Sequence, residues 1–146
     1  MIVAFCGHST YSEREGDRER ALAVIEDHAG DEPVEFFLGQ YGGFDSFAFS
    51  LARTYKEKHP NAVLSFVSPY MDEGYLSRRE DARFDRVIYP PIEGAPKKFA
   101  ITYRNRWIAR EADLLIAYVS HTCGGAYATL RAACAKGKTI FNLAKE

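Results

Sequence analysis

The sequence predicts a three-layer α/β fold, with a mostly parallel six-stranded sheet between two layers of helices. Strand-like runs alternate with helix-like stretches along the chain, which is typical of this class. Most of the strand-like runs are continuously apolar, as expected when helices cover both faces of a parallel sheet. A length of 146 residues is typical of one domain with one core, so we expect residues 1–146 to form a single domain.

The elements follow from local patterns. The expected strands are IVAFCG at 2–7, VEFFLG at 34–39, AVLSFV at 62–67, RVIYP at 86–90, DLLIAYV at 113–119 and TIFNL at 139–143. A first helix is expected over about 17–28, with Gly30 as its C-terminal cap. A second helix stops at Pro60 and has one apolar face, formed by Phe44, Phe47, Ala48, Leu51 and Tyr55. An Ala-rich helix is expected from Gly125 to Lys136, capped by Gly137.

Composition narrows the function classes. The chain has 19 Lys and Arg against 20 Asp and Glu, without the basic excess of a duplex nucleic-acid binder, so nucleic acid is an unlikely partner. Three cysteines without a CxxC pair do not suggest a secreted disulfide framework and fit a reduced cytoplasm. No basic leader and no run of 18 apolar residues occurs, so we expect neither export nor membrane insertion.

Glycine-containing turns follow the expected strands where a ligand usually binds. CGHST, GQYGGFD, SPYMDEGY and SHTCGG each come after a strand, and parallel strands all end at the same edge of the sheet. A glycine lets the backbone approach a ligand, and a following helix offers free N–H groups to an anion. Phosphate is the obvious candidate. A Gly-Gly turn is also explained by steric relief, and neither pair fits GxGxxG or GxxxxGK[ST].

Arg104 is the one charge on an otherwise apolar helical stripe. It lies one turn after Ile101 and one turn before Ile108, on the face that should pack on the sheet, with Asn105 beside it. A charge there needs a partner. Either Arg104 binds the ligand, or it pairs with Glu111 or Asp113 or extends to solvent.

Two other chemistries are weighed on the same loops. Four residues near strand ends could in principle bind zinc, namely Cys6, His8, His121 and Cys123. Cys6 lies within an apolar run, where a small buried thiol is the usual explanation, so no metal and no resident cofactor is expected. A Cys-His nucleophile is not supported either, because no third group can be named to orient it. Base stacking is possible on tyrosines near the loops, namely Tyr41, Tyr70 and Tyr127.

These motifs together resemble a known superfamily. The combination of CGHST, GQYGGFDSFA, RNRWIAREADLLIAYV and CGGAYATLRAA resembles the SLOG superfamily, especially its YpsA-like branch. The resemblance implies a Rossmann-like sheet with strand order 3-2-1-4-5-6 and a small-molecule nucleotide or ribose phosphate as partner. The ligand-binding residues that it and the turns indicate are Gly7, His8, Ser9, Gly42, Gly43, Asp45, Arg104, Gly124, Gly125 and Ala126.

The superfamily includes enzymes as well as binding proteins. Its LOG phosphoribohydrolases cleave a base from a nucleoside monophosphate with an Arg and a Glu, and Arg104 aligns with that Arg. The PGGxGTxxE motif that supplies the Glu is replaced here by CGGAYATLRAA, so Leu130, Arg131 and Ala132 stand where an acid is needed. Asp45 or Glu73, on neighbouring strand-end loops, could still supply a carboxylate from another direction.

The leading prediction is therefore a nucleotide-type ligand-binding or sensing protein. The alternatives are an enzyme acting on an N-glycosidic or phosphoribosyl bond, with catalytic residues unknown, and a scaffold without a ligand. A DNA-processing role, as in the DprA branch of the superfamily, has little support from the charge balance. A homodimer stays open.

Overall fold

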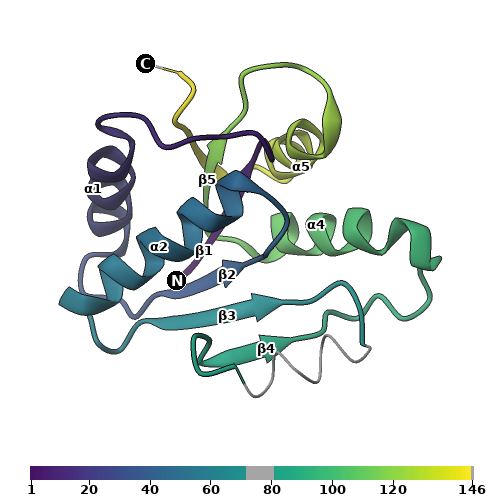
Figure 1. Cartoon of the computed structure of the whole chain (residues 1–146), viewed down its shortest axis with the longest axis horizontal. Helices are drawn as coiled ribbons and strands as arrows, with labels where there is room; N and C mark the ends of the chain where they lie inside the picture. Colours follow the sequence, from purple (N-terminus) through teal and green to yellow (C-terminus); the bar gives the residue numbers. More distant parts are fainter. Residues whose placement is uncertain (72–80, 146) are drawn as a thin grey trace.

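The computed structural model describes residues 1–71 and 81–145, and a six-stranded sheet forms its centre (Figure 1). The strands lie in the order β4-β3-β2-β1-β5-β6, and all five neighbouring pairs are parallel. Their bounds are β1 Ile2–Gly7, β2 Glu35–Leu38, β3 Val63–Val67, β4 Arg86–Ile88, β5 Leu114–Tyr118 and β6 Thr139–Asn142. The predicted α/β class is confirmed.

Helices cover both faces of this sheet, which explains why its central strands are apolar throughout. Helices α1 (Asp17–Ala29) and α2 (Gly43–Lys58) pack on one face, over a core that includes Ile25, Phe36 and Leu51. Helices α4 (Ala100–Glu111) and α5 (Gly124–Ala135) pack on the other face, over a smaller core. Figure 1 shows α4 and α5 side by side, and a short 3-10 helix, η1 (Lys97–Phe99), leads into α4.

The helix predictions are confirmed with small changes at the ends. All five members of the predicted α2 stripe are buried, namely Phe44, Phe47, Ala48, Leu51 and Tyr55. Gly30 caps α1, because its N–H donates to the Glu26 carbonyl 3.0 Å away. Helix α5 ends one residue before Lys136, and Gly137 follows with a φ of 68°, a conformation that favours glycine.

Helix α4 differs from the prediction in its first turn. Arg104 and Ile108 are buried as expected, but Ile101 is 37% exposed. Arg104 reaches the carbonyls of Leu38 and Val67, which are the last residues of β2 and β3. The turn before Arg104 therefore extends past the edge of the sheet, where Ile101 finds no strand to cover it.

The predicted strand order is wrong at one strand. The order 3-2-1-4-5-6 places the fourth strand beside β1, whereas β4 lies at the outer edge beside β3 and β5 pairs with β1. A strand next to β1 must be apolar on both faces, and Leu114–Tyr118 meets this requirement. The short β4 begins with an exposed arginine, which suits an edge. Asp85 fixes it there by accepting from the Leu64 N–H at 2.8 Å.

The strand order creates one switch point, between β1 and β5. From β1 the chain builds outward through β2, β3 and β4, and then returns to add β5 and β6 on the other side. Gly7 pairs with Tyr118, so the loops after β1 and β5 leave the sheet side by side. In open parallel sheets this crevice outside the carboxyl ends is where ligands bind.

Candidate functional site

A cleft of about 410 Å³ opens at this switch point. Four segments of the chain converge on it. The loop after β1 supplies His8, Ser9 and Thr10, the loop after β2 and the start of α2 supply Tyr41 and Asp45, and the first two turns of α4 supply Ile101, Arg104 and Asn105. The loop after β5 and the start of α5 close the remaining side, with His121 and residues 123–126.

The N-terminus of α5 presents free backbone N–H groups to the cleft. Gly124 has a φ of 89°, which a residue with a side chain rarely adopts, and Cys123 at the cap position makes no side-chain capping bond. Among the described residues no group accepts from the N–H of Gly125 or Ala126. A Cβ added at Gly125 would meet no atom within 4 Å, so the backbone there faces open space. The predicted anion site depends on free N–H groups at this turn, and the structure leaves them available.

Arg104 lines the same cleft although it is only 6% exposed. Its Nε donates to the Val67 carbonyl at 2.9 Å, Nη1 to Asn105 Oδ1 at 2.9 Å, and Nη2 to the Leu38 carbonyl at 3.3 Å. Arginine has five N–H donors, and these bonds use three of them. Each Nη therefore keeps one N–H without an acceptor among the described residues.

Neutral oxygens hold this cation, and no carboxylate in the described part of the chain forms an ion pair with it. The alternative partner Asp113 instead accepts from the Ile2 N–H at 2.7 Å. Burial lowers the pKa of Arg104, while the nearby Asp45 and Tyr41 act in the opposite direction. An arginine stays protonated through such a shift. The site therefore keeps a buried positive charge that the protein does not neutralise directly.

Glycines make room for this arrangement. A Cβ at Gly39 would collide with the Arg104 guanidinium and lie 2.9 Å from an Asp45 oxygen. A Cβ at Gly7 would collide with the Phe44 ring. Asp45 also accepts from the Tyr41 N–H at 2.8 Å, which fixes the loop that carries Tyr41 over the guanidinium. Gly39 was not among the predicted site residues, and its place at the end of a strand was the available signal.

Gly42 and Gly43 have a supporting place beside the cleft. Neither lines it. Gly43 donates to the Ser9 carbonyl at 2.8 Å, and a Cβ at Gly42 would lie 2.6 Å from the Ser9 Cα. The two glycines therefore let α2 approach the loop after β1 and hold Ser9 at the cleft. The remaining predicted ligand-binding residues all line it, namely Gly7, His8, Ser9, Asp45, Arg104, Gly124, Gly125 and Ala126.

Two stacked histidines and a cysteine form one wall. The rings of His8 and His121 lie 3.8 Å apart and nearly parallel, and His121 Nδ1 lies 3.3 Å from Cys123 Sγ. His8 Nε2 accepts from the Ser120 N–H, which fixes its proton on Nδ1. Burial and the neighbouring His121 lower the pKa of His8. The sequence analysis found no third group to orient a Cys-His nucleophile, and His8 contacts His121 by ring stacking.

The other sequence-derived candidates are placed as follows. Cys6 is buried, and burial raises the pKa of its thiol to about 12, with smaller contributions from Asp45 and Cys134. No group of three or more His, Cys, Asp or Glu side chains suited to a metal occurs within residues 1–71 and 81–145. Glu73 lies outside the described residues. Of the three residues that stand where the related hydrolases need an acid, Leu130 and Ala132 pack against the smaller core and Arg131 is exposed.

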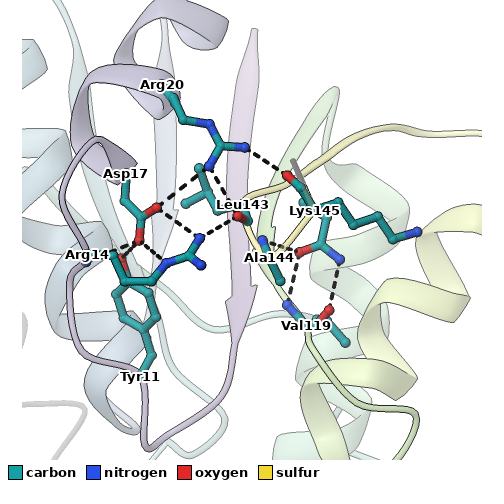
Figure 2. Close-up of polar contacts among 9 residues, drawn as sticks. Tyr11, Arg14, Asp17, Arg20, Val119, Leu143, Ala144 and Lys145 are labelled. Atoms are coloured by element: carbon teal, nitrogen blue, oxygen red, sulfur yellow. Dashed lines mark hydrogen bonds and ion pairs between the residues drawn. The ribbon is translucent and has the colours of Figure 1, made fainter.

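A cluster of polar side chains around one buried carboxylate, Asp17, supports the segment that follows the loop after β1 (Figure 2). Asp17 is 1% exposed and accepts from the Tyr11 hydroxyl at 2.7 Å and from Arg14 at 3.1 Å. Arg14 also donates to the Leu143 carbonyl, as does Arg20. These contacts tie the segment after β6 to α1 and to the chain that follows His8, Ser9 and Thr10. The cluster has a structural role in shaping the cleft.

Two solved structures have a fold similar to that of this chain. The chain resembles the X-ray structure of DNA processing protein A from Streptococcus pneumoniae, with a TM-score of 0.63, 19% identity, and coverage of 97% of this chain and 49% of that one. It also resembles DNA processing protein A from Helicobacter pylori, with a TM-score of 0.59, 16% identity, and coverage of 97% and 64%. No protein-family model and no curated protein sequence matches. At this identity the likeness shows a shared Rossmann-like fold.

One expectation about partners is corrected by these relatives. The charge balance made nucleic acid an unlikely partner, but the H. pylori structure is described as showing a single-stranded DNA binding mode on the same fold. Net charge near zero argues against a basic duplex-binding surface and leaves single strands open, because stacking contributes to their binding. In residues 1–71 and 81–145 no helix is long and apolar enough to span a bilayer.

Proposed function

We propose that the cleft binds a nucleotide or ribose phosphate, and that the chain is a ligand-binding or sensing protein of the YpsA-like SLOG type. One observation carries the proposal. The open N–H groups of Gly125 and Ala126 and the buried guanidinium of Arg104 line the same cleft. A phosphate there would receive backbone hydrogen bonds, the helix dipole and a charge-assisted contact together.

Binding without hydrolysis is the better supported form of this function. A phosphoribohydrolase needs a carboxylate at the reacting centre, and Leu130, Arg131 and Ala132 stand where the related enzymes supply it. Asp45 lines the cleft, but one of its oxygens already accepts from the Tyr41 N–H. Chromatography of deoxyadenosine 5′-monophosphate (dAMP) after prolonged incubation tests this point. Free adenine above the level in a heat-inactivated control would make the chain an enzyme.

The substitution Gly125→Ala tests the binding mode. The added methyl group meets no protein atom and the backbone is not left-handed, so the free energy of unfolding should stay equal or rise by up to about 1 kcal/mol. The methyl group occupies space that a phosphate needs, so the Kd for dAMP should rise by about tenfold or more. Calorimetric titration and thermal unfolding measure both quantities.

Gly94→Ala is the matched control. A Cβ at Gly94 also meets no atom within 4 Å, and Gly94 does not line the cleft. This variant should keep the wild-type Kd for dAMP.

A nucleotide at a concentration of a hundred times its Kd should stabilise the wild type by about 2.7 kcal/mol. Equal nucleotide binding by Gly125→Ala and the wild type would contradict the proposed site, and no thermal shift across a nucleotide panel would favour an empty scaffold.

Single-stranded DNA is a second candidate ligand, favoured by one exposed aromatic ring at the cleft and two more on η1 and α4. Tyr41, Phe99 and Tyr103 are 42%, 47% and 41% exposed, and each lies within 6 Å of a cation, from Arg104, Lys98 and Arg106 respectively. Rings of this kind stack on bases, and each stacked base contributes about 1–3 kcal/mol in single-strand binders. The structural relatives add to this candidate.

Fluorescence anisotropy of a labelled oligothymidylate separates the two ligands. If single strands bind, Tyr103→Ala and Phe99→Ala should weaken the oligonucleotide and leave dAMP unchanged, and affinity should fall with added salt. A duplex of the same length is the control. No change in anisotropy at concentrations that saturate dAMP binding would leave the nucleotide as the ligand.

A further inference from the structure

The cleft continues into a groove between α4 and α5. The groove has a volume of about 580 Å³, and Asn105, Gly125 and Thr129 line both the groove and the cleft. It runs along α5 as far as Cys134 and Ala135 and along α4 between Thr102 and Arg106. A ligand anchored at the N-terminus of α5 therefore has a continuous path away from the cleft.

Two arginines and no carboxylate line this groove. Arg106 and Arg131 are both exposed, and in the described part of the chain neither forms an ion pair. Arg131 donates to the Tyr127 hydroxyl at 3.0 Å, and the Arg106 guanidinium lies 5.7 Å from the Tyr103 ring. Each guanidinium is thus held near the groove by a neutral neighbour and keeps N–H donors for an anion.

The floor of the groove offers little to a cationic or polar ligand. It consists mainly of small side chains, namely Ala128, Ala132 and Ala135, and the Thr129 hydroxyl already donates to the Gly125 carbonyl at 2.9 Å. At the junction with the cleft, Asn105 Oδ1 accepts from Arg104, and no described residue accepts from Asn105 Nδ2. Apart from the Thr102 hydroxyl, which can donate or accept, the side-chain polar groups available along the path are therefore donors.

We infer that the α4–α5 groove is a second anion subsite, and that the ligand is a nucleotide with a second phosphate separated from the first, as in a phosphorylated dinucleotide. This inference rests on the proposed function, since the first phosphate is the one at the N-terminus of α5. Packing of a second copy on this face is disfavoured, because it would bury two arginines without counter-charges.

Two exposed cysteines report on the two subsites separately. Cys123 lies in the cleft and Cys134 lines the groove, while Cys6 is buried. The experiment follows alkylation of each thiol by N-ethylmaleimide with mass spectrometry, in saturating dAMP or in the 5′-phosphorylated dinucleotide pdApdA. We expect dAMP to slow the alkylation of Cys123 alone, and pdApdA to slow that of both exposed cysteines. The dinucleotide should also bind about tenfold more tightly, because it gains charge-assisted contacts.

The double variant Arg106→Gln/Arg131→Gln tests which groups cause the difference. It should abolish the protection of Cys134 and the added affinity for pdApdA, and keep the wild-type Kd for dAMP. Arg110→Gln is the control, because Arg110 lies on α4 with Arg106 but does not line the groove. Protection of Cys123 alone by pdApdA would overturn the second subsite and leave the proposed function standing. No protection of either cysteine and no binding of either nucleotide would overturn both.

Discussion

The molecule buries two charged side chains near the carboxyl edge of its sheet, and it treats them in opposite ways. Asp17 is 1% exposed and forms ion pairs with Arg14 at 3.1 Å and Arg20 at 3.8 Å. Arg104 is 6% exposed, and within residues 1–71 and 81–145 its guanidinium donates only to carbonyl and amide oxygens. The buried anion is neutralised by the protein itself, whereas the buried cation is solvated by neutral groups and keeps its net charge.

This difference separates structure from function. Although burial disfavours its charged form, hydrogen bonds from Arg14 and Tyr11 hold the pKa of Asp17 below its ordinary value, so folding gains from this carboxylate. Arg104 forms no ion pair within the described residues, although Asp45 and Tyr41 partly offset the effect of burial on its pKa, and it borders an open cleft. A buried charge without a counter-charge lowers the stability of the fold, and a bound anion would offset this cost. Asp17 therefore stabilises the fold, and the proposed function gives Arg104 a role in binding.

The largest expected effect is on binding, from Arg104→Met. Loss of the guanidinium removes charge-assisted contacts of about 1.5–3 kcal/mol each, so the Kd for dAMP should rise by about a hundredfold. The Leu38 and Val67 carbonyls lose a donor, so the free energy of unfolding should fall by about 1–3 kcal/mol, with the fold retained. Calorimetric titration and urea unfolding measure the two effects, with Arg110→Met as control. Unchanged nucleotide binding would make Arg104 a purely structural residue.

The reverse pattern is expected for Asp17→Asn. This change removes the ion pairs to Arg14 and Arg20 and weakens the link to Tyr11, so the free energy of unfolding should fall by about 2 kcal/mol. The cost is limited because Arg14 is 44% exposed and stays solvated. The Kd for dAMP should stay within about twofold of the wild type. If Asp17→Asn weakened dAMP binding as much as Arg104→Met does, the contrast drawn between Asp17 and Arg104 would be wrong.

A smaller effect concerns acid stability. Because the folded-state pKa of Asp17 lies below its unfolded value of about 3.9, its contribution is present above about pH 4 and is lost as pH falls through the folded pKa. Wild type should therefore lose more stability between about pH 5 and pH 3 than Asp17→Asn does. Urea unfolding at a series of pH values measures this difference. Parallel curves for the two proteins would show that Asp17 is not linked to acid unfolding.

Local patterns were sufficient for most of the fold but not for its strand order. The continuous apolar run at Leu114–Tyr118 and the stripe on α2 depend on burial alone, which the sequence displays directly. The position of β4 depends on long-range contacts. Its Asp85 bonds to Leu64 and its Arg86 pairs with Glu35, and no spacing in the sequence reveals these partners.

The parts of the candidate site that depend on where strands end could be predicted from the sequence. The parts that depend on packing between distant segments could not. The turn at Gly124 and Gly125 and the buried Arg104 could be anticipated from the expected strand and stripe. The roles of Gly39, which admits the guanidinium, and of His8, which stacks on His121, depend on segments far apart in the chain. The groove with Arg131 exists only because α4 and α5 lie side by side.

An NMR titration tests the central claim most directly. In ¹H–¹⁵N spectra recorded with increasing dAMP, the amides of Gly125 and Ala126 and the Nε–H of Arg104 should shift together and saturate with one Kd. One phosphate would contact the two amides and the Nη groups of Arg104, and the Nε–H reports on that guanidinium. The amides of Gly94 and Gly137, which do not line the cleft, should stay in place. Saturable shifts confined to other surfaces, or no shifts at the α5 N-terminus when binding is complete, would contradict an anion site built from this turn and Arg104.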